Sequence, residues 1–94
     1  MQEYEKAVPS IMYAIALRPR DGAARHHLGF ILENLGCKKE ALPQYRLAVE
    51  FGFGGAAYRL QAAESPGTGL LPPVKPKRQA DCKALLARYP IPTK

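Results

Sequence analysis

Apolar side chains in the middle of the chain recur at the spacing of a helix. Between Asp21 and Gly36 they fall on one helical face, at Leu28, Ile31, Leu32 and Leu35. Asp21 is a typical N-cap residue, and Gly36 is a typical C-cap residue because glycine adopts the left-handed conformation readily. The pattern predicts a helix of about four turns between these two residues.

A second amphipathic segment follows after a tight turn at Gly36 and Cys37. It ends before the glycines at positions 52, 54 and 55, and its apolar face consists of Ala41, Tyr45, Ala48 and Val49. The two predicted helices are separated by only a short turn. They are therefore expected to form an antiparallel hairpin.

Two further helices are expected on either side of this hairpin, over residues 4–18 and 56–64. The sequence Ser65-Pro66-Gly67 stops the second of them. Pro9 and Pro43 are expected in the first turns of their helices, because a proline there removes only an N–H that has no intrahelical partner. These helices should therefore start near Glu5 and Lys39.

The chain also matches itself at an offset of 34 residues. Residues 6–17 (KAVPSIMYAIAL) align with residues 40–51 (EALPQYRLAVEF), with alanine, proline and large apolar positions coinciding. This period resembles the tetratricopeptide repeat over roughly residues 3–64. The positions that carry the resemblance are Leu28, Gly29, Ala41, Tyr45 and Ala48.

The resemblance implies an all-α fold of antiparallel helix-turn-helix repeats, a short α-solenoid, over residues 1–64. In that family, small residues such as Gly29 let paired helices approach closely, while Leu28 and Tyr45 fill the space between them. Three positions depart from the family pattern. Arg25 stands in place of a tryptophan, Leu32 in place of a tyrosine and Phe53 in place of the closing proline.

In this family, the first helix of each pair lines a concave surface that binds peptides. The corresponding face here predicts a partner-binding groove made of His26, Phe30, Glu33 and Asn34. His26 and Glu33 would lie on an open face without a nucleophile or an oxyanion site. His26 and the adjacent His27 point about 100° apart and cannot chelate one ion. We therefore expect no enzyme, no cofactor and no metal site.

The repeats are too few to close a core. The first predicted helix lacks the leading helix of its pair, and a repeat cannot bury its apolar face alone. An external surface is therefore expected to complete the core. The predicted docking face is the side of the first helix that carries Val8, Met12 and Tyr13. That surface would belong either to a partner protein in a multi-subunit complex or to the remainder of a longer array.

Composition changes after residue 64. Residues 65–78 are rich in proline and glycine, which favours an extended linker, here called the strap. Residues 78–89 predict a short helix that ends before Pro90, within a C-terminal segment of residues 79–94. The chain has a formal net charge of +6, concentrated beyond residue 64, where the basic tail comprises Lys75, Lys77, Arg78 and Lys83. The basic tail predicts contact with an acidic protein, with nucleic acid phosphates as the alternative.

The two cysteines, Cys37 and Cys82, allow at most one bridge and match neither a disulfide framework nor a zinc-ligand spacing. Both are predicted to be free thiols in a reducing compartment, and the chain to be intracellular, in the cytoplasm or within an organelle. No apolar run approaches the roughly 20 residues that span a bilayer, because charged residues near position 20 interrupt the longest one. We therefore expect no membrane span.

The function expected from the sequence is that of a non-catalytic protein–protein interaction module, as an adaptor or structural subunit. One alternative is a ribonucleoprotein subunit that binds nucleic acid through the basic tail. A second follows from another resemblance: the order AAYRLQAAE, strap and ALLARY is similar to the linker that leads into the catalytic part of repeat-bearing methyltransferases. The chain would then be a remnant of such an enzyme.

Overall fold

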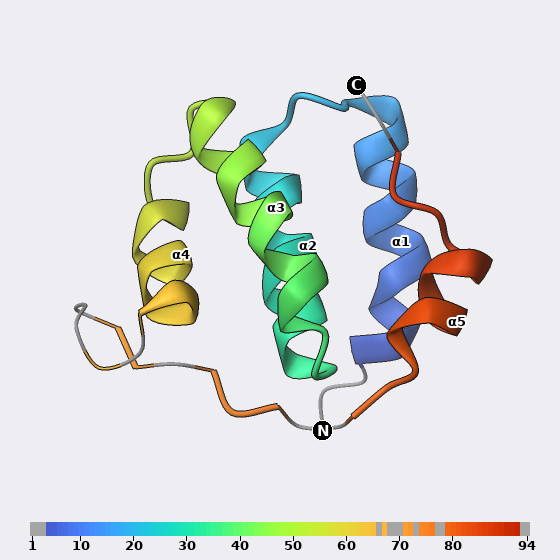
Figure 1. Ribbon diagram of the computed structural model, residues 1–94. Coiled ribbons are helices and arrows are strands. Elements are labelled where there is room, and N and C mark those ends of the chain that lie inside the picture. The colour runs from blue at the N-terminus through green and yellow to red at the C-terminus, as the bar shows by residue number, and fades with distance from the viewer. Residues whose placement is uncertain (1–3, 66, 68–70, 73, 77–78, 93–94) are drawn as a thin grey trace.

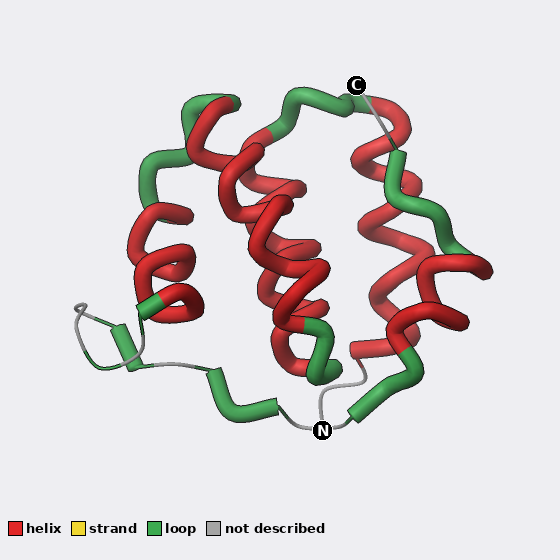
Figure 2. Tube along the Cα trace, in the orientation of Figure 1, coloured by secondary structure: helices red, strands yellow, loops and turns green. Residues whose placement is uncertain are grey.

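The computed structural model describes residues 4–65, 67, 71–72, 74–76 and 79–92. The helices found among them are α1 (Tyr4–Leu17), α2 (Gly22–Asn34), α3 (Lys38–Glu50), α4 (Ala56–Glu64) and α5 (Cys82–Arg88). In Figure 1, α2 and α3 form a central hairpin with α1 on one side and α4 on the other. Figure 2 shows helices and loops but no strand in this part of the chain, so the predicted all-α class is confirmed. No helix within it is long and apolar enough to cross a membrane.

Side-chain caps and glycines set the ends of the central helices. The Asp21 carboxylate accepts a hydrogen bond from the Ala24 N–H at 3.2 Å, which caps α2 as predicted. Gly36, at φ +79°, follows the end of α2, and Gly52, at φ +94°, follows the end of α3. Both glycines hold left-handed conformations that other residues adopt only with strain. Local chemistry therefore fixes where the hairpin starts, turns and stops.

The two helical prolines lie just beyond the first turn of their helices. Pro9 is the sixth residue of α1 and Pro43 is the sixth residue of α3, because these helices start at Tyr4 and Lys38, one residue before the predicted starts. A proline at such a position removes one i→i−4 hydrogen bond. Both side chains are exposed, so water can reach the solvent side of each helix at this point. The packing of the opposite face keeps both helices continuous despite the lost bonds.

Close contact between α2 and α3 centres on a glycine and a tyrosine. Gly29 is buried in α2, and a Cβ atom built on it would lie 2.7 Å from Cε1 of the buried Tyr45 in α3. The absence of a side chain at position 29 therefore lets the tyrosine ring lie directly on the backbone of α2. The role predicted for Gly29 is confirmed.

We expect Gly29→Ala to lower the free energy of unfolding by about 1 kcal/mol. Overpacking against the Tyr45 ring costs about 1–3 kcal/mol, and the better helix propensity of alanine offsets about 1 kcal/mol of this. Chemical denaturation monitored by circular dichroism measures the difference. Gly54→Ala is the control, because no atom lies within 4 Å of a Cβ built there. Equal stability of the two variants would contradict the close approach.

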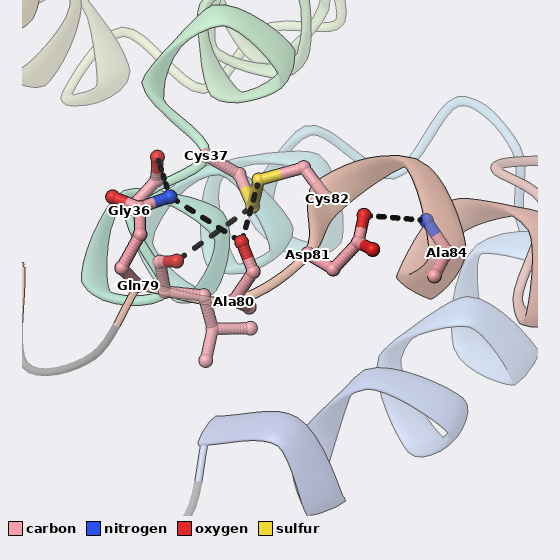
Figure 3. The surroundings of a disulfide bond; sticks show 8 residues. Gly36, Cys37, Gln79, Ala80, Asp81, Cys82 and Ala84 are labelled. Atoms are coloured by element: carbon pink, nitrogen blue, oxygen red, sulfur yellow. Dashed lines mark hydrogen bonds between the residues drawn. A yellow bond between two sulfur atoms is a disulfide. The ribbon is translucent and has the colours of Figure 1, made fainter.

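A disulfide between Cys37 and Cys82 joins the C-terminal segment to the turn between α2 and α3 (Figure 3). The prediction of two free thiols is therefore wrong. The Ala80 N–H also donates to the Leu35 carbonyl at 2.8 Å, and Gln79 Nε2 donates to the Gly36 carbonyl at 3.3 Å. Spacing in the sequence did not reveal the bridge, because the strap brings together cysteines that are 45 positions apart.

The C-terminal segment lies beside α1 in Figure 1 and belongs to the same core as the preceding helices. The helix α5 is shorter than predicted, because Asp81 caps it by accepting a hydrogen bond from the Ala84 N–H at 3.1 Å. Leu85, on its inner face, is buried in the cluster that contains Val8 and Met12. The described part of residues 79–94 is thus packed against residues 4–64.

This packing changes the predicted docking face. Val8 and Met12 are buried within the chain itself, whereas Tyr13 is 67% exposed. Leu85 and neighbouring apolar residues of the C-terminal segment join the core where an external surface was expected. The chain therefore covers most of this face without a partner, and Val8 and Met12 are not available for docking.

Candidate functional site

The predicted groove on α2 is only partly present. His26 and Phe30 are half-buried, but Glu33 and Asn34 are 5% and 2% exposed. Asn34 Nδ2 donates to the Phe30 carbonyl at 2.9 Å, within the same helix. The close approach of α3 at Gly29 turns the C-terminal part of this face into the interior. Glu33 and Asn34 are therefore structural residues, not groove residues.

Phe30 lies between side chains from two other helices, α1 and α4. The Arg59 guanidinium of α4 lies 5.3 Å from the Phe30 ring centroid, and the Tyr4 ring of α1 packs edge-on at 6.5 Å. Arg59 Nη1 is 3.4 Å from the Pro72 carbonyl of the strap. The accessible remainder of the α2 face is thus already occupied by a cation from α4, and the strap contacts this cation.

The buried polar groups beside this face hold the aromatic core in place. The Tyr45 hydroxyl donates to Glu33 Oε1 at 2.6 Å. Burial raises the pKa of the Glu33 carboxyl, although the hydrogen bond from Tyr45 lowers it. The His26 ring lies 5.6 Å from Tyr45 and 4.9 Å from Phe53. Burial, with repulsion from Arg59 and His27, lowers the pKa of His26, so its ring is neutral at pH 7.

The basic tail is described only in part. Lys75 is exposed in the strap and Lys83 is exposed on α5, whereas Lys77 and Arg78 lie outside the described residues. The described lysines therefore belong to different elements. Their side chains remain open to solvent, as expected of residues that contact an acidic surface.

A cavity of about 500 Å³ lies between α3 and the end of the C-terminal segment. This size falls within the range of small-molecule and side-chain pockets. We call it the C-terminal cavity, and it is lined by Arg25, Lys39, Glu40, Pro43, Gln44, Leu47, Ile91 and Pro92. Its walls therefore combine apolar side chains with two cations and one carboxylate.

Arg25 is the unusual residue of this cavity, because it is only 1% exposed. Its Nε donates to the Pro19 carbonyl and its Nη1 to Gln44 Oε1, both at 3.1 Å. Its Nη2 is buried and has no hydrogen-bond partner among the described residues. Burial lowers the pKa of Arg25, yet a guanidinium stays charged at neutral pH. A buried positive charge is thus held by two neutral oxygens.

Sequence reasoning did not place Arg25 in a site, although one signal was present. Arg25 occupies the position that the repeat pattern gives to a tryptophan, which indicates a buried environment. A charged residue is rarely buried unless it is paired. What the sequence did not indicate was the second wall of the cavity, because Ile91 and Pro92 arrive there only through the return of the C-terminal segment.

Comparisons with protein-family models, with curated proteins and with solved structures found no match to this chain. Membership of the tetratricopeptide family therefore stays a prediction from the repeat residues. The site is accordingly interpreted from its own geometry, in which the C-terminal cavity and its buried arginine are the most distinctive features.

Proposed function

We propose that this chain is a non-catalytic protein-binding module, an adaptor or subunit of a larger assembly, that holds a carboxylate of its partner in the C-terminal cavity. The observation that carries the proposal is the buried Arg25, which lines a partly apolar cavity and whose Nη2 has no hydrogen-bond partner among the described residues. The resemblance to tetratricopeptide repeats, which bind peptides, supports the same class of function.

The charges of the cavity favour an anionic group. Arg25 and Lys39 outnumber the single carboxylate of Glu40. A buried guanidinium is stabilised best by a carboxylate, because it presents several N–H donors in a fixed fork that fits two oxygens. A carboxylate bound in the cavity would therefore supply the negative charge that the buried guanidinium lacks.

The apolar walls favour a peptide over a free inorganic anion. Pro43 and Leu47 of α3 face Ile91 and Pro92 across the cavity. Such walls gain free energy by covering apolar side chains, at about 25 cal/mol per Å² of buried apolar surface. An acidic residue with leucine-like neighbours satisfies both parts of the cavity. Recognition of this kind needs no catalytic group.

We expect the purified chain to bind short peptides that carry glutamate between leucines. The isosteric glutamine peptides should bind about tenfold more weakly or worse, since a hydrogen bond to a charged group contributes about 1.5–3 kcal/mol. Fluorescence anisotropy with labelled peptides measures both affinities. Equal affinities for the two peptides, or binding of neither, would refute the proposal.

Two neighbouring lysines provide a matched pair of variants. Lys38 and Lys39 are both exposed near the start of α3, but only Lys39 lines the cavity. Lys39→Glu should weaken binding of the acidic peptide by roughly threefold to tenfold, whereas Lys38→Glu should have a much smaller effect. Arg25→Met, checked for helicity by circular dichroism, should weaken binding further. Equal effects at positions 38 and 39 would indicate non-specific charge attraction.

A further inference from the structure

Glu40 lies beside the disulfide and completes a cluster of three metal-ligating side chains. One carboxylate oxygen of Glu40 and the sulfur atoms of Cys37 and Cys82 all lie within 4.8 Å of one another. Cys37 is the N-cap of α3, Glu40 lies in the first turn of the same helix, and Cys82 begins α5. Two separate elements of the fold therefore bring these groups to one point.

Contacts other than the S–S bond hold this arrangement. The hydrogen bond from Ala80 to Leu35 and the contact of Gln79 with Gly36 join the same two segments, as Figure 3 shows for Gln79. Leu85, less than one helical turn beyond Cys82, is buried in the core. Reduction of the disulfide would therefore leave two thiols facing each other beside Glu40.

We propose that the reduced chain binds one Zn²⁺ ion through the sulfur atoms of Cys37 and Cys82 and the carboxylate of Glu40. Thiolate sulfur and carboxylate oxygen are both normal zinc ligands, at about 2.3 Å and about 2.0–2.2 Å from the metal. Two thiolates favour zinc over magnesium or calcium, which prefer oxygen ligands. With three protein ligands, the fourth tetrahedral position is open to water.

Small side-chain movements suffice to form this site. In a tetrahedral zinc site the two sulfur atoms lie about 3.8 Å apart, and sulfur and oxygen lie about 3.6 Å apart. After reduction the two sulfur atoms separate from bonding distance to about 3.8 Å, and the carboxylate oxygen moves about 1 Å closer to them. Lys38 and Lys39 follow Cys37 directly, and the positive N-terminal end of α3 lies at the same point.

The disulfide and the zinc site exclude each other, since both use the same sulfur atoms. A phosphine reductant supplies two electrons to the S–S bond and becomes a phosphine oxide, with water providing the oxygen atom and the two thiol protons. Zinc then replaces those two protons and binds the resulting thiolates. The metal thereby restores a cross-link between the α2–α3 turn and α5. This inference does not rest on peptide binding by the C-terminal cavity.

The test compares the oxidised and the phosphine-reduced chain after incubation with Zn²⁺ and gel filtration. Elemental analysis should find about one zinc per reduced chain and none on the oxidised chain. Co²⁺ in place of zinc should give the near-ultraviolet sulfur-to-cobalt absorption of a two-thiolate site. Absence of metal on the reduced chain would overturn the proposal, whether or not circular dichroism shows that its helices remain.

Three variants identify the ligands. Cys82→Ser should abolish the cobalt–thiolate band of a two-sulfur site. Glu40→Gln should weaken zinc binding by about tenfold or more, because loss of a residue that only hydrogen-bonds to a metal ligand already has an effect of this size. The matched control is Glu50→Gln at the other end of α3, which should bind zinc like the unaltered chain. Equal zinc affinity in the Glu40 and Glu50 variants, or undiminished binding by Cys82→Ser, would overturn the three-ligand site.

Discussion

Replacing Cys82 with serine is expected to lower the free energy of unfolding by about 4 kcal/mol. The disulfide joins positions 45 apart, and a cross-link of that span restricts the unfolded chain by about this amount in the chain-entropy treatment. For a chain of 94 residues, the loss corresponds to a decrease in Tm of roughly 20 °C. Thermal unfolding followed by circular dichroism, in the absence of metal, measures it.

The disulfide also keeps α5 over the core of α1, so its loss should have a local effect. Leu85 covers the cluster that contains Val8 and Met12, and detachment of α5 would expose these residues. Binding of a hydrophobic dye should therefore increase in Cys82→Ser. Ala87→Ser, on the exposed side of α5, is the matched control and should behave like the unaltered chain. Unchanged unfolding of Cys82→Ser would show that the bridge contributes nothing to stability.

Replacing Tyr45 with phenylalanine is expected to cost about 3 kcal/mol, because it removes the hydroxyl group that donates a hydrogen bond to the buried Glu33 carboxylate. The aromatic ring that packs on Gly29 is kept, so the loss reports the hydroxyl group. Urea denaturation at pH 7 measures the difference. Tyr58→Phe is the control, because Tyr58 is exposed on α4, and it should change stability by less than about 0.5 kcal/mol.

A second substitution separates the hydrogen bond from the buried charge. Glu33→Gln keeps an oxygen that accepts from Tyr45 but removes the charge, so we expect its stability at pH 7 to lie within about 1 kcal/mol of the unaltered chain. In the double variant, Tyr45→Phe should cost much less than it does alone. Additive effects of the two substitutions would contradict a direct interaction between these side chains.

The raised pKa of Glu33 gives this comparison a defined pH dependence. Folding favours the protonated carboxyl, so the contribution of Glu33 to stability is fully present below its unfolded pKa and is lost as the pH rises through the raised folded pKa. The stability of Glu33→Gln relative to the unaltered chain should therefore increase from acidic to neutral pH. The lowered pKa of His26 makes both proteins more stable as the pH rises. This contribution is the same in Glu33→Gln and in the unaltered chain, so it cancels in the difference between their stabilities.

The residues that set the helices act over short distances, so their roles could be predicted. Asp21 caps α2 through the Ala24 N–H three residues on, and Gly36 ends the helix through its own backbone angle. The contact of Gly29 with Tyr45 follows from two adjacent helices joined by a tight turn. In each case, the partners lie within one helix or one hairpin, where the spacing in the sequence determines the spacing in space.

The candidate sites combine groups that are far apart along the chain, and this explains why most of them were missed. The sequence predicted a short helix in the C-terminal segment, but it did not show that this helix packs in the same core as α1. The predicted docking residues Val8 and Met12 were correctly identified as apolar positions that need a partner. Their partner belongs to the same chain.

The sequence by itself determined the all-α class and the positions of four helices, because these depend on local periodicity, caps and turns. The close approach of the helices at Gly29 was implied by the resemblance to the repeat family. Only the tertiary structure decided that Cys37 bonds to Cys82, that Ile91 lines a cavity together with Arg25, and that Glu40 lies beside the two sulfur atoms. Those contacts depend on the path of the strap and on which apolar surface the C-terminal segment covers. Neither is encoded in the spacing of neighbouring residues.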